Sequence, residues 1–488
     1  MRDDPGFARM FNPRTIAIVG VSRSGETEHP GYTGSMFLRM LKDSGYKGRL
    51  YPVNPKASVI EGVKVYPSVT SIPEPLDFVI IAVPAVAVPQ VLEDCVTVGA
   101  FNVHVCTAGF GETGQPEGKL LEQRVKEIAL RGKLRLIGPN CMGCHVPAVG
   151  MRMFLEVPLV HGPVAVISQS GGHAYAYLRH DAPIGIGFSK VISFGNALVL
   201  EAPDFLEYLA TDPESKIICM YLEGIRNGRR LIELVKRINR EKPVIVWKGG
   251  LTSSGRRAAA SHTGSMAGDE RMWDAFFKQT GAIKVGSIEE MADVTMTILK
   301  LNRQIGDRVA VLGGGGGNNV ATGDICAQEG LDMPALSPET ISKLTGFISL
   351  VNQAVVNPLD IAGVIGNMPL LKRVLAAIVA DPRIDTIILS VSPGFWTGAS
   401  IDGMVKVEGH LSDLNLNIAG GKPLILTVHD QGKAEETVKA IREMREAGMT
   451  VYTSLRGACR ALRRVADYYK FLAQKDTVTP AQTAAYRR

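Results

Sequence analysis

One histidine lies in an unusually small-residue stretch of the chain. His262 sits within Ala-Ala-Ala-Ser-His-Thr-Gly-Ser-Met-Ala-Gly at residues 258–268. A histidine buried for structural reasons is normally packed by large apolar neighbours, whereas this ring can be approached closely. Imidazole is abundant as the free base near neutral pH, so it can accept a group and pass it on. The stretch indicates a group-transfer histidine, with an ordinary loop histidine as the alternative.

An apolar strand that runs into a Gly/Ser turn occurs three times. The strands and their turns cover residues 15–22, 163–172 and 308–317. In an α/β fold such a turn opens a helix, whose exposed N–H groups and positive dipole attract anions. The pattern predicts up to three phosphate- or carboxylate-binding corners. At any one of them, a tight connection without a ligand is the alternative.

Length and composition indicate a multidomain α/β protein. With 488 residues, the chain should divide into about three domains. The net charge of +6 suits anionic small molecules, and no basic block with interleaved aromatic residues indicates nucleic-acid binding. Seven scattered cysteines favour the reducing cytoplasm. No signal peptide and no run of ~20 apolar residues is visible, so no membrane span is expected.

The first predicted domain covers residues 1–145. Short β-branched runs alternate there with helical stretches, which is typical of a parallel, doubly wound sheet of the Rossmann type. The nicotinamide fingerprint is incomplete, and the second strand ends in Asn54-Pro55-Lys56, where a ribose-binding acid is expected. A nicotinamide oxidoreductase is therefore disfavoured. Lys56 suits an additional phosphate group, such as the one on coenzyme A. The predicted strands are 15–20, 49–53, 77–83, 101–106 and 135–137, and the predicted helices are 34–44 and 117–131.

Two further α/β domains are predicted at residues 160–302 and 306–475. Glu223 comes at the carboxyl end of a strand, where such sheets build their sites. A carboxylate facing His262 would fix the tautomer of the imidazole; a role as a cap or ion-pair partner is the alternative. Strands are predicted near 163–168, 186–193, 216–223, 243–248, 308–312, 385–391 and 423–428, and helices at 287–302 and 456–473.

Several motifs, in this order and spacing, resemble the NDP-forming acyl-CoA synthetases, relatives of succinyl-CoA synthetase. The similarity extends over nearly the whole chain. It rests on the stretches 11–22, 51–56, 138–141, 167–171, 193–196 and 261–264. The resemblance implies an N-terminal Rossmann-like CoA-binding domain followed by two flavodoxin-like, doubly wound domains of the succinyl-CoA synthetase type.

The resemblance also implies the roles of particular residues. His262 would be phosphorylated transiently, and Glu223 would orient it. Two facing helix starts would hold the phosphate, through Ser168, Gln169, Ser170, Gly171 and Gly172 on one side and Gly315, Gly316, Gly317 and Asn318 on the other. The CoA-binding positions would be Gly20, Ser22, Arg23, Val53, Asn54, Lys56, Val83, Pro84, Thr107 and Asn140. No metal site is expected in this chain.

The implied reaction is carboxylate + CoA + ATP ⇌ acyl-CoA + ADP + phosphate. No G-x-x-x-x-G-K-[ST] loop occurs in the sequence, and the ATP-grasp portion of the family is not recognisable in it. An ATP-grasp beta subunit that holds ATP and Mg²⁺ is therefore expected, in an α2β2-type assembly. Val199 and Glu201 replace two aspartates that the family usually shows. A non-catalytic CoA- or acyl-CoA-binding regulatory protein and a citryl-CoA-type ligase or lyase are the alternatives.

Overall fold

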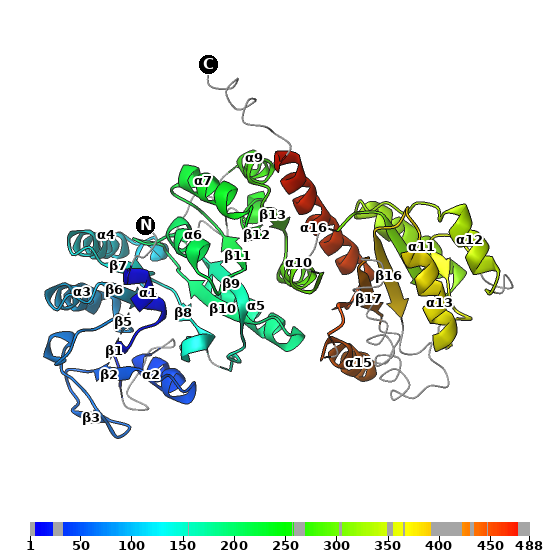
Figure 1. The fold of residues 1–488 in the computed structure, drawn as a ribbon. Coiled ribbons are helices and arrows are strands. Elements are labelled where there is room, and N and C mark those ends of the chain that lie inside the picture. The colour runs from blue at the N-terminus through cyan, green and yellow to red at the C-terminus, as the bar shows by residue number, and fades with distance from the viewer. Residues whose placement is uncertain are drawn as a thin grey trace, which may run out of the picture. The chain divides into compact units, whose positions relative to one another are not determined.

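Three sheets built mainly of parallel strands carry the fold (Figure 1). The computed structural model describes residues 5–22, 33–154, 156–255, 257, 269–301, 305–348, 355–364, 367–391, 422–429, 434–446 and 448–476. The chain divides into two compact units, residues 1–288 and 289–488. Two of the sheets belong to the first unit and one to the second. The predicted α/β fold class is confirmed.

The first sheet has the strand order β2-β1-β5-β6-β7, and all its strands are parallel. Its inner strands are short and buried along their whole length, as a sheet covered on both faces requires. Strands β1 and β5 are mainly apolar, whereas β6 also contains Asn102 and His104. All five strands predicted for this domain are present. The elements are α1 (Pro5–Phe11), β1 (Thr15–Val19), α2 (Gly34–Asp43), β2 (Arg49–Val53), the hairpin β3 (Val59–Ile60) and β4 (Val63–Lys64), β5 (Phe78–Ile81), α3 (Val88–Thr97), β6 (Asn102–Val105), α4 (Pro116–Arg131) and β7 (Arg135–Ile137).

The second sheet has the strand order β13-β12-β11-β9-β10-β8. The short strand β8 pairs antiparallel with β10, and the other strands are parallel. Neither β8 (Gly-Cys-His) nor β13 (Ile-Lys-Val) was expected from the sequence, because neither forms a continuous β-branched run. The elements are β8 (Gly143–His145), β9 (His161–Ser168), α5 (Gly171–Asp181), β10 (Phe188–Ser193), α6 (Ala202–Thr211), β11 (Ile217–Leu222), α7 (Gly228–Ile238), β12 (Val244–Lys248), α9 (Glu270–Thr280) and β13 (Ile283–Val285).

The loop after β10 joins the two sheets of the first unit. Leu198 N–H donates to the carbonyl oxygen of Gly138 at 2.9 Å, so the loop pairs with the chain that follows β7. Gly195 has a φ of +53°, and a Cβ atom there would lie 2.3 Å from the carbonyl oxygen of Asn140. Only glycine permits this approach, which fixes the end of the first sheet against the second.

The second unit contains the parallel sheet β15-β14-β16-β17-β18. Helix α10 packs on α16 and β18 within this unit. Glu290 forms an ion pair with Arg464 of α16 at 3.1 Å, and Thr297 forms a hydrogen bond with Tyr452 of β18 at 2.5 Å. The elements are α10 (Ile288–Leu301), β14 (Val309–Gly313), α11 (Gly316–Gln328), α12 (Pro338–Thr345), β15 (Leu359–Asp360), α13 (Met368–Val379), β16 (Thr386–Val391), β17 (Leu424–Val428), α15 (Ala434–Glu446), β18 (Val451–Tyr452) and α16 (Leu455–Asp476).

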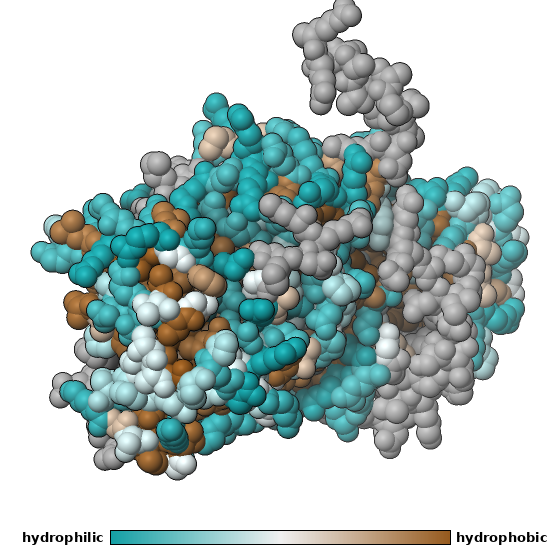
Figure 2. Space-filling view, turned by 60° about the vertical axis from the view of Figure 1, so that its left-hand side comes forward, coloured by the Kyte–Doolittle hydropathy of each residue, from teal (hydrophilic) through white to brown (hydrophobic). Residues whose placement is uncertain are grey.

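Polar groups cover most of the face seen in Figure 2, and apolar atoms form separate areas among them. The large apolar side chains exposed around the first sheet are Val59, Val86, Phe101, Leu120 and Leu130. Among the described helices, none is both long enough and apolar enough to cross a bilayer.

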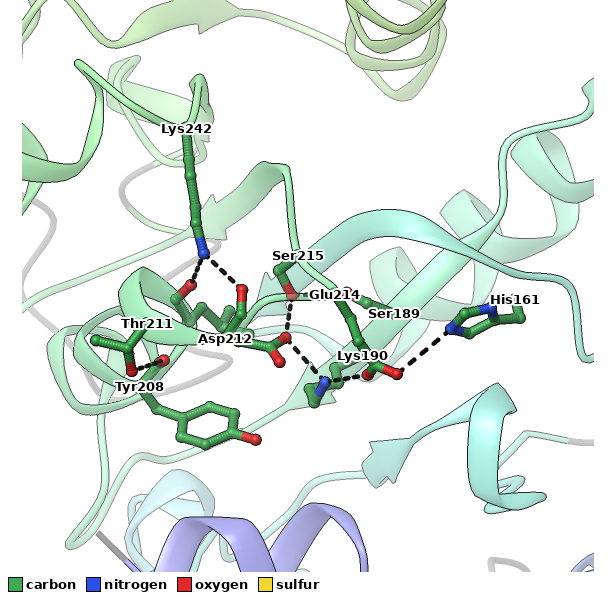
Figure 3. Close-up of polar contacts among 10 residues, drawn as sticks. His161, Ser189, Lys190, Tyr208, Thr211, Asp212, Glu214, Ser215 and Lys242 are labelled. Carbon is green, nitrogen blue, oxygen red and sulfur yellow. Dashed lines mark hydrogen bonds and ion pairs between the residues drawn. The ribbon is translucent and has the colours of Figure 1, made fainter. Parts of the chain in front are cut away.

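A buried ion-pair network supports the second sheet at the edge opposite the strand ends that build the candidate site (Figure 3). Lys190 on β10 is 3% exposed, and its Nζ lies 2.8 Å from both Asp212 Oδ2 and Glu214 Oε2. Ser215 Oγ donates to the same Asp212 oxygen at 2.5 Å, and His161 lies 3.7 Å from Glu214. The attraction between the ammonium group and the carboxylates offsets the desolvation cost that each charge would have alone in the interior.

Removing the cation of this network should destabilise the second sheet. Lys190→Met leaves the Asp212 carboxylate buried without its partner, at an expected cost of about 3–5 kcal/mol. The matched control is Lys284→Met, because its ion pair with Asp274 is much more exposed and should contribute less than about 1 kcal/mol. Hydrogen exchange at the β9 and β10 amides would measure both costs. Equal effects of the two substitutions would contradict the assigned role of the network.

Candidate active site

Five adjacent strands of the first sheet end at one edge, where most of the expected CoA-binding residues lie. Because the strands are parallel, the residues that end or follow β1, β2, β5, β6 and β7 come to the same edge. These residues are Gly20, Ser22, Val53, Asn54, Lys56, Val83, Pro84, Thr107 and Asn140. Arg23 lies outside the described residues.

The backbone at the end of β1 requires glycine. Gly20 has a φ of +98°, and a Cβ atom there would lie 2.1 Å from the carbonyl oxygen of Ala82. A Cβ atom at Gly34, the first residue of α2, would lie 2.5 Å from the carbonyl carbon of Gly20. The helix therefore begins directly against the turn, which places a helix N-terminus at this edge.

Polar side chains tie the strand ends of this edge together. Asn54 Nδ2 donates to the Val21 carbonyl oxygen at 2.6 Å, and Lys56 N–H donates to Asn54 Oδ1 at 2.7 Å. Thr107 Oγ1 donates to the Val83 carbonyl oxygen at 2.7 Å. Asn54 and Thr107 thus shape the corner through backbone groups, whereas Lys56 is exposed beside it.

A second corner lies where β9 leads into α5. Ser170 caps α5, and its Oγ accepts a hydrogen bond from His173 N–H at 3.3 Å. Ser168 Oγ donates to the carbonyl oxygen of Ser170 at 2.6 Å, which fixes the turn. Gly171 and Gly172 form the first turn of the helix. The free N–H groups and the dipole at such a helix start favour an anion.

Glu223 lies at this second corner and is held there through its backbone. Gln169 Oε1 accepts hydrogen bonds from Glu223 N–H at 2.8 Å and from Gly224 N–H at 3.0 Å. Glu223 is 5% exposed, and its Oε2 is buried without a hydrogen-bond partner among the described residues. The structure thus brings together Gln169 and Glu223, two of the residues singled out in the sequence.

Residues that the sequence reasoning missed surround this acid. Lys248 ends β12 and donates from Nζ to the carbonyl oxygen of Glu223 at 2.8 Å. The His173 ring stacks on Tyr221 with 4.0 Å between centroids, and Trp247 lies edge-on to both rings. Burial, followed by the charge of Glu223, raises the pKa of the Tyr221 phenol. The strand-end rule that selected Glu223 could also have selected Lys248, which likewise ends an apolar strand.

His262 lies outside the described residues, so its predicted position near Glu223 stays a prediction. In the second unit, Gly315 has a φ of +92° and caps α11, and Asn318 Nδ2 donates to the Gly314 carbonyl oxygen at 3.1 Å. Gly316 and Gly317 begin this helix. Within the described ranges, no group of three or more His, Cys, Asp or Glu side chains could hold a metal ion.

The two positions that depart from the family pattern have roles within the protein. Val199 is partly buried against the core of the first sheet. Glu201 precedes α6; its N–H donates to Asp204 Oδ2 at 2.9 Å, and its Oε2 accepts from Arg226 N–H at 3.3 Å. The protein itself therefore engages both side chains.

Two family models match residues that lie mostly in the first unit. A CoA binding domain covers residues 14–147, and a succinyl-CoA ligase like flavodoxin domain covers residues 161–298. A solved structure from Ca. Korarchaeum cryptofilum, a dinucleotide forming acetyl-coenzyme A synthetase 1 in complex with phosphate and ADP, is 30% identical with a TM-score of 0.83. That match covers 98% of this chain and 100% of the other.

Relatives of known activity align with most of the chain. The alpha subunit of acetate–CoA ligase [ADP-forming] II from Pyrococcus furiosus is 38% identical over 440 residues, which are 89% of this chain and 92% of the relative. Acetate–CoA ligase [ADP-forming] I from Archaeoglobus fulgidus is 38% identical over 386 residues. The second match covers 79% of this chain but only 55% of the longer relative.

Loss of the Gln169 acceptor should loosen the end of β11. Gln169→Ala leaves two buried N–H groups without a partner, each at a cost of about 1–3 kcal/mol. Amide exchange at Glu223 and Gly224 should therefore accelerate at least about fivefold. Gln90→Ala, which removes an exposed contact with Asp94, should change neither rate. Unchanged amide exchange in Gln169→Ala would show that the hydrogen bonds to Gln169 do not hold the end of β11.

Proposed function

Because the chain belongs to the ADP-forming acyl-CoA synthetase family, we propose that it is the alpha-type subunit of an acid–CoA ligase. The reaction is carboxylate + CoA + ATP ⇌ acyl-CoA + ADP + phosphate. We assign the phosphohistidine to His262 and its orientation to Glu223. CoA binds at the strand ends of the first sheet.

One observation supports the phosphohistidine assignment above all others. The Glu223 carboxylate is buried, and its Oε2 atom has no hydrogen-bond partner in the described part of the chain. Gln169 holds the backbone N–H of the same residue. An unpaired carboxylate oxygen in the interior is costly. The ring N–H of His262 would satisfy it and would leave the other ring nitrogen free as the nucleophile.

Phosphoryl transfer to His262 then needs little more than correct positioning of the reacting groups. The His262 nitrogen attacks the γ-phosphorus of ATP, which breaks the bond to the bridging oxygen and releases ADP. We assign the oxygens of the transferred phosphoryl group to the start of α5, where the helix N–H groups stabilise their charge. A substrate carboxylate attacks phosphorus, which breaks the N–P bond and forms an acyl phosphate. The CoA thiolate next attacks the acyl carbon and releases inorganic phosphate. The start of α11, with Gly315, Gly316, Gly317 and Asn318, is a further helix N-terminus to which we assign a phosphate-binding role.

ATP and Mg²⁺ are assigned to an ATP-grasp beta subunit in an α2β2-type assembly. Two observations support this assignment. The Pyrococcus furiosus relative carries the name of an alpha subunit, and the sequence has no phosphate-binding loop of the G-x-x-x-x-G-K-[ST] type. On this proposal, phosphoryl transfer from ATP needs the partner, whereas transfer from an acyl phosphate does not.

CoA should bind the full-length chain more tightly than dephospho-CoA or NAD, because Lys56 lies exposed beside the corner where the additional phosphate is expected. Lys56→Glu should weaken CoA binding about tenfold and dephospho-CoA binding much less, since it replaces an attraction with a repulsion. Calorimetry measures all three affinities. Lys126→Glu on the exposed side of α4 makes the same charge change and should have no effect. A preference for NAD would refute the assignment of the first sheet.

His262 should become phosphorylated on a ring nitrogen when the full-length chain is incubated with acetyl phosphate. His262→Ala should abolish the label and all thioester formation while leaving CoA binding intact. Glu223→Gln should slow labelling by about 10²–10³, the usual cost of one well-placed electrostatic contact. Mass spectrometry locates the label, and stability in base with lability in acid distinguishes phosphohistidine from phosphoserine.

The control for these variants is Glu207→Gln on α6. It removes a partly exposed ion pair with Arg230 of α7, and the variant should be labelled normally. A phosphate on Ser261 or Ser265, or full activity of His262→Ala, would refute the mechanism. A regulatory protein without chemistry would bind CoA in every variant and carry no label in any of them.

A further inference from the structure

A buried lysine ties together the two strands that end beside Glu223. Lys248 is 5% exposed and ends β12, the neighbour of β11 in the second sheet. Its Nζ donates to the carbonyl oxygen of Glu223 at 2.8 Å and also to the carbonyl oxygen of Gly249. A buried ammonium group is tolerated only when its N–H groups are paired. The lysine therefore fixes the strand end from which the chain continues toward His262.

Among the described residues, groups from three parts of the fold surround this amine. Directly after β11, the Glu223 carboxylate is the charged group that favours the ammonium form, and the Tyr221 phenol of β11 lies beside that carboxylate. On α9, the uncharged ring of Trp273 lies 5.3 Å from Nζ. On α5, the His173 imidazole stacks on Tyr221. Burial outweighs Glu223 and lowers the pKa of Lys248 to about 8.

We propose, on the basis of the function proposed above, that Lys248 is a positioning residue for phosphorylation of His262. Its ammonium group holds the end of β12 against the end of β11 and supplies positive charge beside the orienting carboxylate. Hydrogen bonds from a charged donor are roughly twice as strong as neutral ones. As the pH rises, deprotonation of Lys248 therefore weakens its hydrogen bond to the carbonyl oxygen of Glu223 and slows phosphorylation of His262.

Stability responds to this proton in the opposite direction. The folded-state pKa of Lys248 is about 8, below the ordinary value of 10.5. Between these two pH values the unfolded chain binds more protons than the folded one, so the contribution of Lys248 to the free energy of unfolding increases as the pH rises. Deprotonation of Lys248 therefore does not unfold the protein, so unfolding through this residue cannot explain a slower phosphorylation of His262 above pH about 8.

The test compares initial rates of His262 labelling by acetyl phosphate across neutral and alkaline pH in the full-length protein. The wild-type rate should fall above pH about 8. Lys248→Met should label about 10–100-fold more slowly at neutral pH, as is usual when a supporting contact is lost, and without this alkaline fall. Lys248→Arg keeps the charge, so it should retain labelling and move the fall to higher pH.

Lys242→Met is the matched control. Lys242 lies just before the other end of β12, is partly buried, and donates from Nζ to the carbonyl oxygens of Leu209 and Asp212, each at 2.7 Å. Its replacement removes similar hydrogen bonds at the opposite edge of the sheet. It should leave the rate of His262 labelling and the pH profile of that rate unchanged.

The outcomes separate this inference from the proposed function. A wild-type chain without label on His262 refutes the proposed function, and the inference fails with it. If the wild type is labelled while Lys248→Met keeps its rate and pH profile, only the inference is overturned. If Lys248→Met does not fold or does not bind CoA, Lys248→Arg decides the question. If the labelling rate of Lys248→Arg falls at the same alkaline pH as that of the wild type, the proposed role of the Lys248 charge is contradicted.

Discussion

The candidate site depends on one pair of hydrogen bonds, from the N–H groups of Glu223 and Gly224 to the side-chain oxygen of Gln169. Gln169 belongs to the turn that opens α5, and Glu223 follows β11. The pair therefore joins the helix start that can hold an anion to the carboxylate that can orient a base. Because both donors are buried, their partner cannot be lost without a large cost in free energy.

Lys248, at the end of β12, also holds the backbone of Glu223. Its bond to the Glu223 carbonyl oxygen means that the backbone of the acid is held on both sides, by Gln169 at the N–H and by Lys248 at the C=O. The carboxylate can then serve as an acceptor without also having to hold the loop in place. Fixing a reacting group through neighbours that do not themselves react is the usual way in which proteins preorganise a site.

The sequence predicted the parallel strands well, because buried β-branched runs such as 15–19 and 217–222 leave little choice of structure. It also selected Glu223, since strand ends in parallel sheets build sites. It missed β8, β13, β15 and β18, whose two or three residues carry no periodicity. It passed over Lys248, because a lysine at a strand end is usually solvated. Only the packing of Trp273 and the neighbouring strand reveals that this one is buried.

The glycines of the second corner differ in what they require. A Cβ atom at Gly171 would lie 2.7 Å from Met142 Cγ, so packing inside the protein excludes a side chain there. At Gly172 a Cβ atom would have only Ser170 Oγ within 4 Å, at 3.8 Å, and no positive φ demands glycine. Neither packing nor backbone strain in the described structure therefore accounts for Gly172. The proposed function supplies a reason, because a bare helix start allows phosphate oxygens to approach the backbone N–H groups directly.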